Sequence, residues 1–114
     1  MTVSQKNATM FKQKFIIKPA GEEHCQYAET ITDEMERSAE YIKTKMREGK
    51  AVIALTKTGD WAGFCYIEAW GHGKFVANSG LIVSPDFRKF GLAREIKKEV
   101  FKLSRKKFPD SKIF

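Results

Sequence analysis

The sequence has 114 residues, of which 42% are hydrophobic and 31% are charged, and its formal net charge is +7. This length allows one domain with one core. The positive charge favours an anionic partner, but it does not distinguish a nucleic acid, a membrane surface and a phosphorylated small molecule. No apolar run approaches the roughly 20 residues that a membrane-spanning helix needs, so no membrane association is expected. Two cysteines without a CxxC pair exclude a disulfide framework and a zinc site, and they suit the cytoplasm.

The N-terminus is polar and lacks the apolar stretch of a secretory signal. Residues 1–13 are therefore expected to form a flexible tail, followed by one domain over 14–114. The run at 14–18 is short, apolar and β-branched, which predicts the first strand. Pro19 and Gly21 end it.

A helical region is expected next. Glu22 and Glu23 supply the carboxylates that favour a helix start. Apolar residues then recur at helical spacing, and no Pro or Gly interrupts 22–48, so this region is either one long helix or two abutting helices. No breaker is visible around 38–41. Gly49 is placed to end the region.

Three strand-like runs follow at 51–56, 61–70 and 74–84. The segments between them, 57–60 and 71–73, contain the Gly and Asp residues of tight turns. Because such short turns join only antiparallel neighbours, the three runs are predicted to form a meander.

The C-terminal part reads as one helix and one short strand. Pro85 stops the third run of the meander, and an apolar stripe then marks a helix that runs to about Lys107. Pro109 ends that helix, and 111–114 resembles the opening of a further strand. A strand joined through a helix to the next strand is normally parallel to it. The order β-α(α)-β-β-β-α-β therefore predicts an α+β fold with a mixed sheet.

The segment at 81–93, LIVSPDFRKFGLA, carries the most chemical information. A strand and a turn lead into a basic, glycine-containing loop that opens a helix, where unpaired N–H groups attract anions. Gly91 lets an anion approach the backbone, and Arg88 and Lys89 add positive charge. These features predict a pyrophosphate site. A turn before a basic helix that binds no ligand is the alternative, and the spacing alone leaves both open. Neither a Walker A loop nor a GxGxxG fingerprint is present.

The pattern Val83-x-Pro85-x-Phe87-Arg88-x-x-Gly91-x-Ala93 resembles motif A of the GNAT N-acetyltransferases. The predicted element order is also similar to theirs, and the resemblance covers about 15–114, with N-acetylglutamate synthase-like enzymes as one candidate subgroup. It implies that Arg88 flanks a pyrophosphate site for acetyl-coenzyme A. It further implies that backbone amides of Lys89, Phe90, Gly91, Leu92 and Ala93 hold the pyrophosphate, and that main-chain groups of Leu81, Ile82 and Val83 pair with the pantetheine arm.

The resemblance implies an enzyme that transfers the acetyl group of acetyl-coenzyme A to a primary amine of a small molecule, such as an amino acid, without a metal. A fixed amide would stabilise the oxyanion that forms. Ala93 replaces a glycine that is commoner in the family. The resemblance also implies that the C-terminal part of the family fold, with a thiolate-protonating tyrosine, is missing. Whether the chain forms a homodimer stays open.

The resemblance also predicts that the third meander strand splays from the strand starting at Ser111, and Gly80 is suited to a bulge there. Glu68 is a candidate general base acting through water, with a solvent-facing strand residue as the alternative. Asn78 is a second catalytic candidate, near the acceptor or the carbonyl. His24 and His72 have no metal-ligand partners at useful spacing and are expected at the surface. Cys65 is expected to be a small core residue.

A small basic nucleic-acid-binding module is the alternative function. The last helix is rich in Lys and Arg, which is typical of a solvated helix face but also of a nucleic-acid footprint. Trp61, Phe64, Tyr66 and Trp70 could then stack on bases. No RNP-like, KH or helix-turn-helix pattern supports this function, so nucleic acid is not the expected partner.

Overall fold

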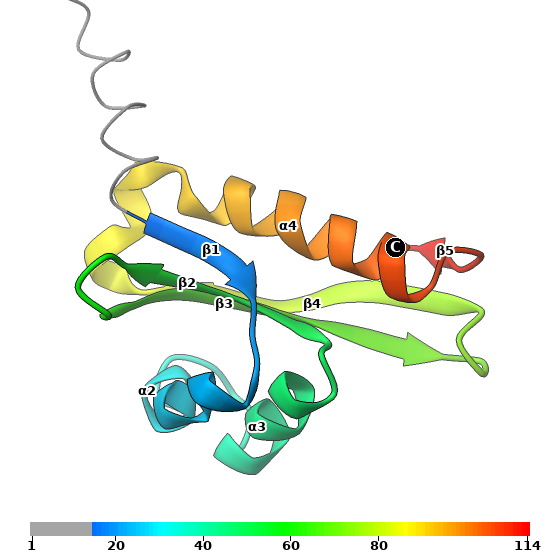
Figure 1. Ribbon diagram of the computed structural model, residues 1–114, viewed down its shortest axis with the longest axis horizontal. Helices are drawn as coiled ribbons and strands as arrows, with labels where there is room; N and C mark the ends of the chain where they lie inside the picture. The colour runs from blue at the N-terminus through cyan, green and yellow to red at the C-terminus, as the bar shows by residue number, and fades with distance from the viewer. Residues whose placement is uncertain (1–14) are drawn as a thin grey trace, which may run out of the picture.

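A computed structural model describes residues 15–114, and the tail expected at 1–13 lies outside them. In this part of the chain a five-stranded sheet carries helices on both faces (Figure 1). The predicted order β-α(α)-β-β-β-α-β is confirmed. The elements are β1 (Phe15–Pro19), η1 (Glu22–Tyr27), α2 (Ala28–Thr32), α3 (Ala39–Arg47), β2 (Ala51–Thr56), β3 (Trp61–Trp70), β4 (Phe75–Val83), η2 (Pro85–Phe90), α4 (Leu92–Lys107) and β5 (Lys112–Ile113).

The sheet is mixed, as predicted, with strand order β1-β2-β3-β4-β5. The pairings from β1 to β4 are antiparallel, which confirms the meander, and β5 runs parallel to β4. The expectation that a helical connection joins parallel strands is wrong for β1 and β2. The amide of Ala20 donates to the carbonyl of Ala51 at 2.8 Å. β2 therefore starts beside the C-terminal end of β1, and the helical connection begins and ends at the same end of the sheet.

Helices cover the two faces of the sheet from opposite sides (Figure 1). The predicted apolar stripe of α4 is confirmed, since Leu92, Ile96 and Val100 are fully buried against one face. On the other face, α2 and α3 bury Ile31 and Ile42. Between 15 and 114, no helix is both long enough and apolar enough to span a bilayer.

The helical region before β2 is interrupted, so the expectation of no break around 38–41 is wrong. It consists of η1, α2 and, after a loop, α3. Ser38 caps α3, because its Oγ accepts a hydrogen bond from the amide of Tyr41 at 3.1 Å. A serine at this position satisfies one of the free donors of a helix start and so favours a new helix over a continuing one. Gly49 ends α3 with a φ of 69°, as predicted.

His24 is buried, with 3% of its surface exposed, so its predicted surface position is wrong. Its Nδ1 accepts a hydrogen bond from the amide of Gly21 at 2.9 Å and closes the first turn of η1. Burial is the main cause that lowers the pKa of His24, partly opposed by the neighbouring carboxylate of Glu23. The imidazole therefore acts as a neutral cap of η1.

Candidate functional site

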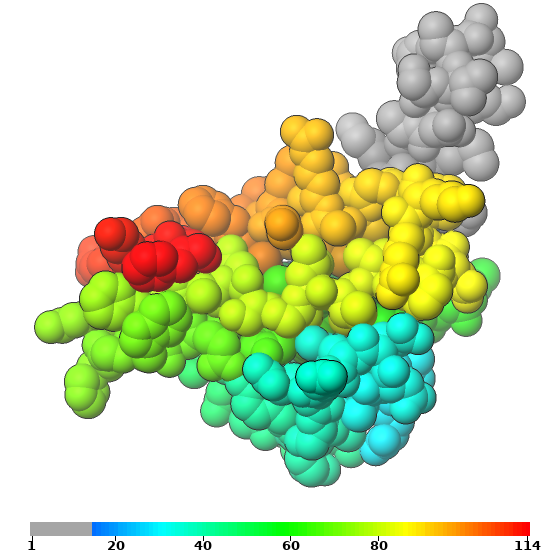
Figure 2. All heavy atoms as spheres, turned by 180° about the vertical axis from the view of Figure 1, so that it is seen from behind, coloured from blue at the N-terminus to red at the C-terminus, as the bar shows by residue number. Residues whose placement is uncertain are grey.

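One edge of β4 is largely open. β5 pairs with β4 only through Phe75 and Val76, so within 15–114 Ile82 and Val83 are paired with β3 alone and Leu81 has no strand partner. Figure 2 shows β4 (yellow-green) at the surface between α4 (orange) and the α2–α3 side (cyan to teal). Leu81 and Val83 point their side chains to the α4 face, and Ile82 points to the other. What Leu81, Ile82 and Val83 present along this edge is therefore backbone.

A β-bulge interrupts β4 at Gly80. The partners of Phe64 and Tyr66 on β3 are Ile82 and Ser79, so β4 holds one extra residue there. Gly80 has a φ of 61°, a region that favours glycine. A Cβ at this position would overlap the ring of Tyr66, with Cδ1 at 2.6 Å and Cζ at 2.8 Å. The predicted bulge is confirmed, and both its backbone angle and the ring beneath it require glycine.

The segment predicted as a basic loop is the junction between η2 and α4. Lys89 and Phe90 end η2, Gly91 adopts φ 69° and ψ 20°, and α4 begins at Leu92. The side chain of Leu92 is buried and Ala93 packs partly against the core, so their backbone lies in the first turn of an anchored helix. A Cβ on Gly91 would meet no atom within 4 Å. Free first-turn amides facing open space suit an anionic group.

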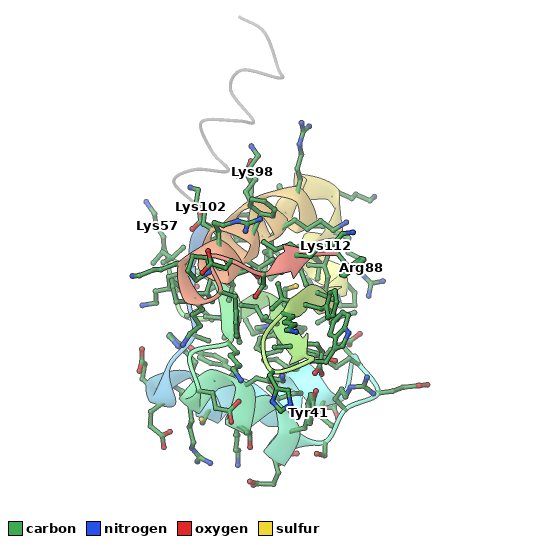
Figure 3. All side chains as sticks on the ribbon, turned by 90° about the vertical axis from the view of Figure 1, so that its right-hand side faces the viewer. Tyr41, Lys57, Arg88, Lys98, Lys102 and Lys112 are labelled. Atoms are coloured by element: carbon green, nitrogen blue, oxygen red, sulfur yellow. The ribbon has the colours of Figure 1, made fainter. Side chains whose placement is uncertain are left out.

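Arg88 lies beside this junction and is tied to the end of β4. Its Nε donates to the carbonyl of Val83 at 3.0 Å, and its Nη2 lies 3.9 Å from Oε2 of Glu34. About half of its side chain, 55%, is exposed, and Figure 3 shows it reaching outward from the yellow end of the ribbon. The guanidinium therefore adds positive charge next to the first turn of α4.

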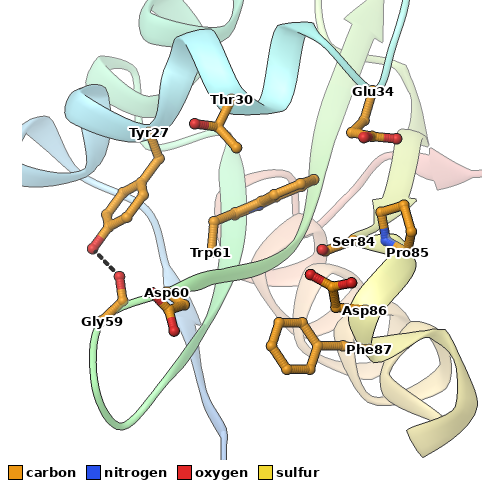
Figure 4. A pocket seen from close by; sticks show the side chains of 10 residues that line it. All are labelled: Tyr27, Thr30, Glu34, Gly59, Asp60, Trp61, Ser84, Pro85, Asp86 and Phe87. Atoms are coloured by element: carbon orange, nitrogen blue, oxygen red, sulfur yellow. Dashed lines mark hydrogen bonds between the residues drawn. The ribbon is translucent and has the colours of Figure 1, made fainter.

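A pocket of about 620 Å³ lies between α2, the turn from β2 to β3, and η2 (Figure 4). Its wall contains the carboxylates of Glu34, Asp60 and Asp86. The hydroxyl of Tyr27 donates to the carbonyl of Gly59 at 2.7 Å along one side. Like charges repel, so these carboxylates disfavour a phosphate. The pocket is thus a poorer place for an anionic ligand than the first turn of α4.

Glu68 lies in a polar cluster on the α2–α3 side of the sheet. The hydroxyl of Tyr41 donates to Oε1 of Glu68, and the ammonium of Lys45 lies 3.5 Å from Oε2. Lys45 also donates to the carbonyl of Ile67 at 2.8 Å. Burial is the main cause that lowers the pKa of Lys45. The Glu68 side chain is 35% exposed, so it is held by its partners but still accessible to solvent.

Arg37, in the loop between α2 and α3, extends this cluster. Its Nε donates to the hydroxyl of Tyr66 at 3.0 Å, and its guanidinium carbon lies 5.7 Å from the ring centroid of Tyr41. The pKa of Arg37 is raised, mainly by the hydrogen bond to Tyr66, with a smaller contribution from Glu68. The sequence alone assigned no functional role to Arg37, Tyr41 or Lys45, although it made Glu68 a catalytic candidate. The four-residue spacing of Tyr41 and Lys45 on one helix face was the available signal.

The two catalytic candidates do not come together. Oδ1 of Asn78 accepts a hydrogen bond from Oγ of Ser104 on α4 at 2.6 Å, whereas Glu68 is bonded to α3 on the opposite face. Cys65 is a core residue, as predicted, and burial raises the pKa of its thiol to about 12. Residues 15–114 contain no group of three or more His, Cys, Asp or Glu side chains that could hold a metal ion.

The features expected of a nucleic-acid-binding module, the four aromatic rings and a basic helix face, do not occur together on one surface. Trp61, Phe64 and Tyr66 are buried, so their predicted role as stacking platforms is wrong, and only Trp70 has a substantially exposed ring. The cations of α4 do lie on its outer face, where Figure 3 labels Lys98 and Lys102. Both of these pair with a glutamate one turn earlier, at 3.5 Å and 3.2 Å. Within 15–114 the exposed aromatic ring on this face is Phe101, over which the Arg105 guanidinium lies, and not the four rings predicted to stack on bases.

The comparisons with known proteins agree with this architecture. The fold is similar to N-acetylglutamate synthase from Neisseria gonorrhoeae, solved with coenzyme A and N-acetyl-glutamate, with a TM-score of 0.67 and 15% identity over 81% of this chain and 23% of that one. It is similar to the GNAT family N-acetyltransferase YhbS from Escherichia coli, solved with CoA, with a TM-score of 0.64 and 17% identity over 82% and 58%.

A third similar structure is the diaminobutyrate acetyltransferase EctA from Paenibacillus lautus, solved with L-2,4-diaminobutyric acid and coenzyme A. Its TM-score is 0.66 and its identity 14%, over 78% of this chain and 57% of that one. The chain thus spans less than two thirds of each of these proteins. No curated protein matches the sequence. A family model described as the acetyltransferase (GNAT) family matches residues 17–112, which is most of the chain, and the protein therefore belongs to the GNAT acetyltransferase family.

Proposed function

We propose that this protein binds acetyl-coenzyme A and transfers its acetyl group to a primary amine of a small molecule, such as an amino acid. One observation carries the proposal: the open backbone edge of β4 runs past the Gly80 bulge to the free amides at the start of α4. The synthase and the diaminobutyrate acetyltransferase, which have this fold, are described with coenzyme A and with amino-acid ligands. Their ligands support the class of acceptor proposed.

The cofactor would be held mainly by backbone. Main-chain groups of Leu81, Ile82 and Val83 would pair with the pantetheine arm along the open edge of β4. Amides of Lys89, Phe90, Gly91, Leu92 and Ala93 would bind the pyrophosphate, with Arg88 neutralising charge from the side. Gly91 fits this role because the space in front of it is open. Apolar burial of Leu92 keeps these amides in place before a ligand arrives.

Acetyl-coenzyme A supplies an acyl group on sulfur, and in the transfer an N–C bond forms as the C–S bond breaks. The amine must lose a proton to attack, and Glu68 is the proposed acceptor of that proton, directly or through water. The bonds from Tyr41 and Lys45 hold its carboxylate in one orientation. Asn78 remains a catalytic prediction. Its bond to Ser104 makes it a group that joins β4 to α4.

A cytoplasmic location and transfer without a metal are parts of the same proposal. The free thiols of Cys25 and Cys65 support a reducing compartment. A homodimer remains a prediction.

Calorimetric titration of coenzyme A tests the proposal. We expect Gly91→Glu to abolish binding, because it puts a like charge and a side chain where the phosphates would approach. Gly73→Glu is the matched control, since Gly73 also has a positive φ, 83°, but lies in the turn between β3 and β4. Circular dichroism checks that both variants fold. Undiminished affinity in a folded Gly91→Glu protein would overturn the proposed cofactor site.

A further inference from the structure

We propose that the acceptor carries a carboxylate close to its amine, and that Arg37 binds that carboxylate while Glu68 receives the amine. This inference rests on the proposed function and names the substrate class, α-amino acids or close analogues. Both side chains contact the Tyr41 side chain: the guanidinium lies over its ring, and the Glu68 carboxylate accepts a hydrogen bond from its hydroxyl. Opposite charges held this way match a zwitterion.

The guanidinium of Arg37 is held in place by neutral groups. Nε donates to the hydroxyl of Tyr66 at 3.0 Å, and Nη1 donates to the carbonyl of Glu36 at 3.1 Å. A guanidinium has five N–H donors in a planar fork, so one donor on Nη1 and both donors on Nη2 have no partner among residues 15–114. These donors form the end of the fork that binds a carboxylate bidentately.

Two other arginines of the chain show the contrast, whereas Arg105, in the last turn of α4, is held by the carbonyls of Pro109 and Ser111. Arg47 pairs with Glu22 at 2.7 Å, and Arg88 lies 3.9 Å from Glu34. Arg37 has no carboxylate within ion-pair distance in the part of the chain that the structure describes, although it is exposed and oriented. Its position is fixed without its charge being cancelled. Because its side chain is already held in one conformation, Arg37 is preorganised and loses little conformational entropy when an anion binds.

The position of Arg37 fits a role in binding the acceptor and not the phosphates of coenzyme A. Tyr66, which holds it, pairs with Ser79 and packs its ring against Gly80 at the bulge. Glu68 is the next residue on the same face of β3, bonded to the helical side. The first turn of α4, where the pyrophosphate is proposed, begins beyond the far end of β4. A diamine would place its second ammonium, a like charge, beside Arg37, so the pair also discriminates against diamines.

Equilibrium binding to the protein loaded with coenzyme A tests the inference, by calorimetry or NMR saturation transfer. A panel of α-amino acids is compared with the matching α-carboxamides, which keep the amine and remove the carboxylate charge. For the amino acid that binds best, we expect Arg37→Gln to weaken binding by about 10- to 100-fold, the range for a hydrogen bond to a charged group. Binding of its carboxamide should stay unchanged.

Arg37→Lys should recover part of the affinity, because it keeps the charge and loses the fork. Arg47→Gln is the control, since Arg47 is an exposed arginine whose carboxylate partner lies outside the cluster. The inference fails if no amino acid binds, if carboxamides bind as tightly as the acids, or if Arg37→Gln weakens binding of coenzyme A itself. Failure of the unaltered protein to bind coenzyme A would instead contradict the proposed function.

Discussion

The two faces of the sheet are built differently. Under α4 the contacts are almost wholly apolar, with Leu92, Ile96 and Val100 fully buried. On the α2–α3 face an apolar cluster of similar extent is bordered by charged and phenolic groups, among them Arg37 and Glu68. The apolar face fixes where the start of α4 points, and the mixed face carries groups that can exchange protons. Under the proposed function, holding coenzyme A and accepting the proton of the amine would thus fall to opposite sides of one sheet.

The largest expected difference between the faces is in their tolerance of a single methyl group. Gly80→Ala should lower the free energy of unfolding by about 3 kcal/mol or more, because it combines a left-handed backbone with overlap of the rigid Tyr66 ring. Gly63→Ala, whose Cβ would overlap the flexible end of Ile96 under α4, should cost about 1 kcal/mol. Urea unfolding of both variants measures the difference.

Gly91→Ala is the control for backbone strain alone, since its φ of 69° is similar and the space beside it is empty. It should cost about 1 to 2 kcal/mol. If Gly80→Ala were no worse than Gly91→Ala, the ring of Tyr66 would not constrain the bulge.

The α4 face should be sensitive to alkali. Burial raises the pKa of Cys65 to about 12, while the thiol of the unfolded chain ionises near its ordinary value of 9.0. The unfolded state then releases a proton that the folded state keeps, so stability is lost as the pH rises from 9 towards 12. The slope should approach roughly 1.4 kcal/mol per pH unit. Subtracting the profile of Cys65→Ala isolates this contribution, and parallel profiles would exclude it.

The opposite face should be sensitive to acid, by a smaller amount. The pKa of His24 is lowered, chiefly by burial, so the folded state resists protonation and stability falls as the pH drops below the ordinary value of 6.5. Protonated Nδ1 cannot accept the Gly21 amide, and losing such a cap costs on the order of 1 kcal/mol. His24→Gln keeps an acceptor without titrating. Thermal melts of both proteins between neutral and mildly acid pH should therefore diverge below 6.5.

Much of the fold could be predicted from local patterns. The apolar stripe of α4 and the turns between β2, β3 and β4 depend on residues close together in the sequence, and so does the bulge at Gly80. The break before α3 was also readable, because Ser38 followed by Glu40 ahead of an apolar residue is a helix-start signal. The absence of Pro and Gly from 22–48 does not by itself make a helix continuous, because a capping serine can start a new one.

The polar cluster could not be predicted in the same way. Tyr41 and Glu68 are 27 residues apart, and Arg37 and Tyr66 are 29 apart, so their contacts depend on how α3 packs on the sheet. Glu68 was a candidate from its strand position, but nothing local indicated its partners. His24 illustrates the same limit, because its burial follows from the fold of the first turn and not from any periodicity.

The bulge at Gly80 also determines which face of the sheet the later residues of β4 occupy. Val76 faces α4 before the bulge, and Leu81 and Val83 face it afterwards, an odd separation that a regular strand does not allow. A regular strand carrying all of these residues would turn Leu81 and Val83 to the opposite face, so the extra residue at the bulge is what keeps them against α4. Deleting one residue at the bulge would restore strict alternation and leave both side chains on the α4 face, whereas a one-residue insertion or deletion elsewhere in β4 would reverse every side chain between it and the bulge or the strand end. Evolution can therefore exchange side chains along this strand one at a time, and the bulge is a place where the strand can lose a residue while the residues after it keep their face.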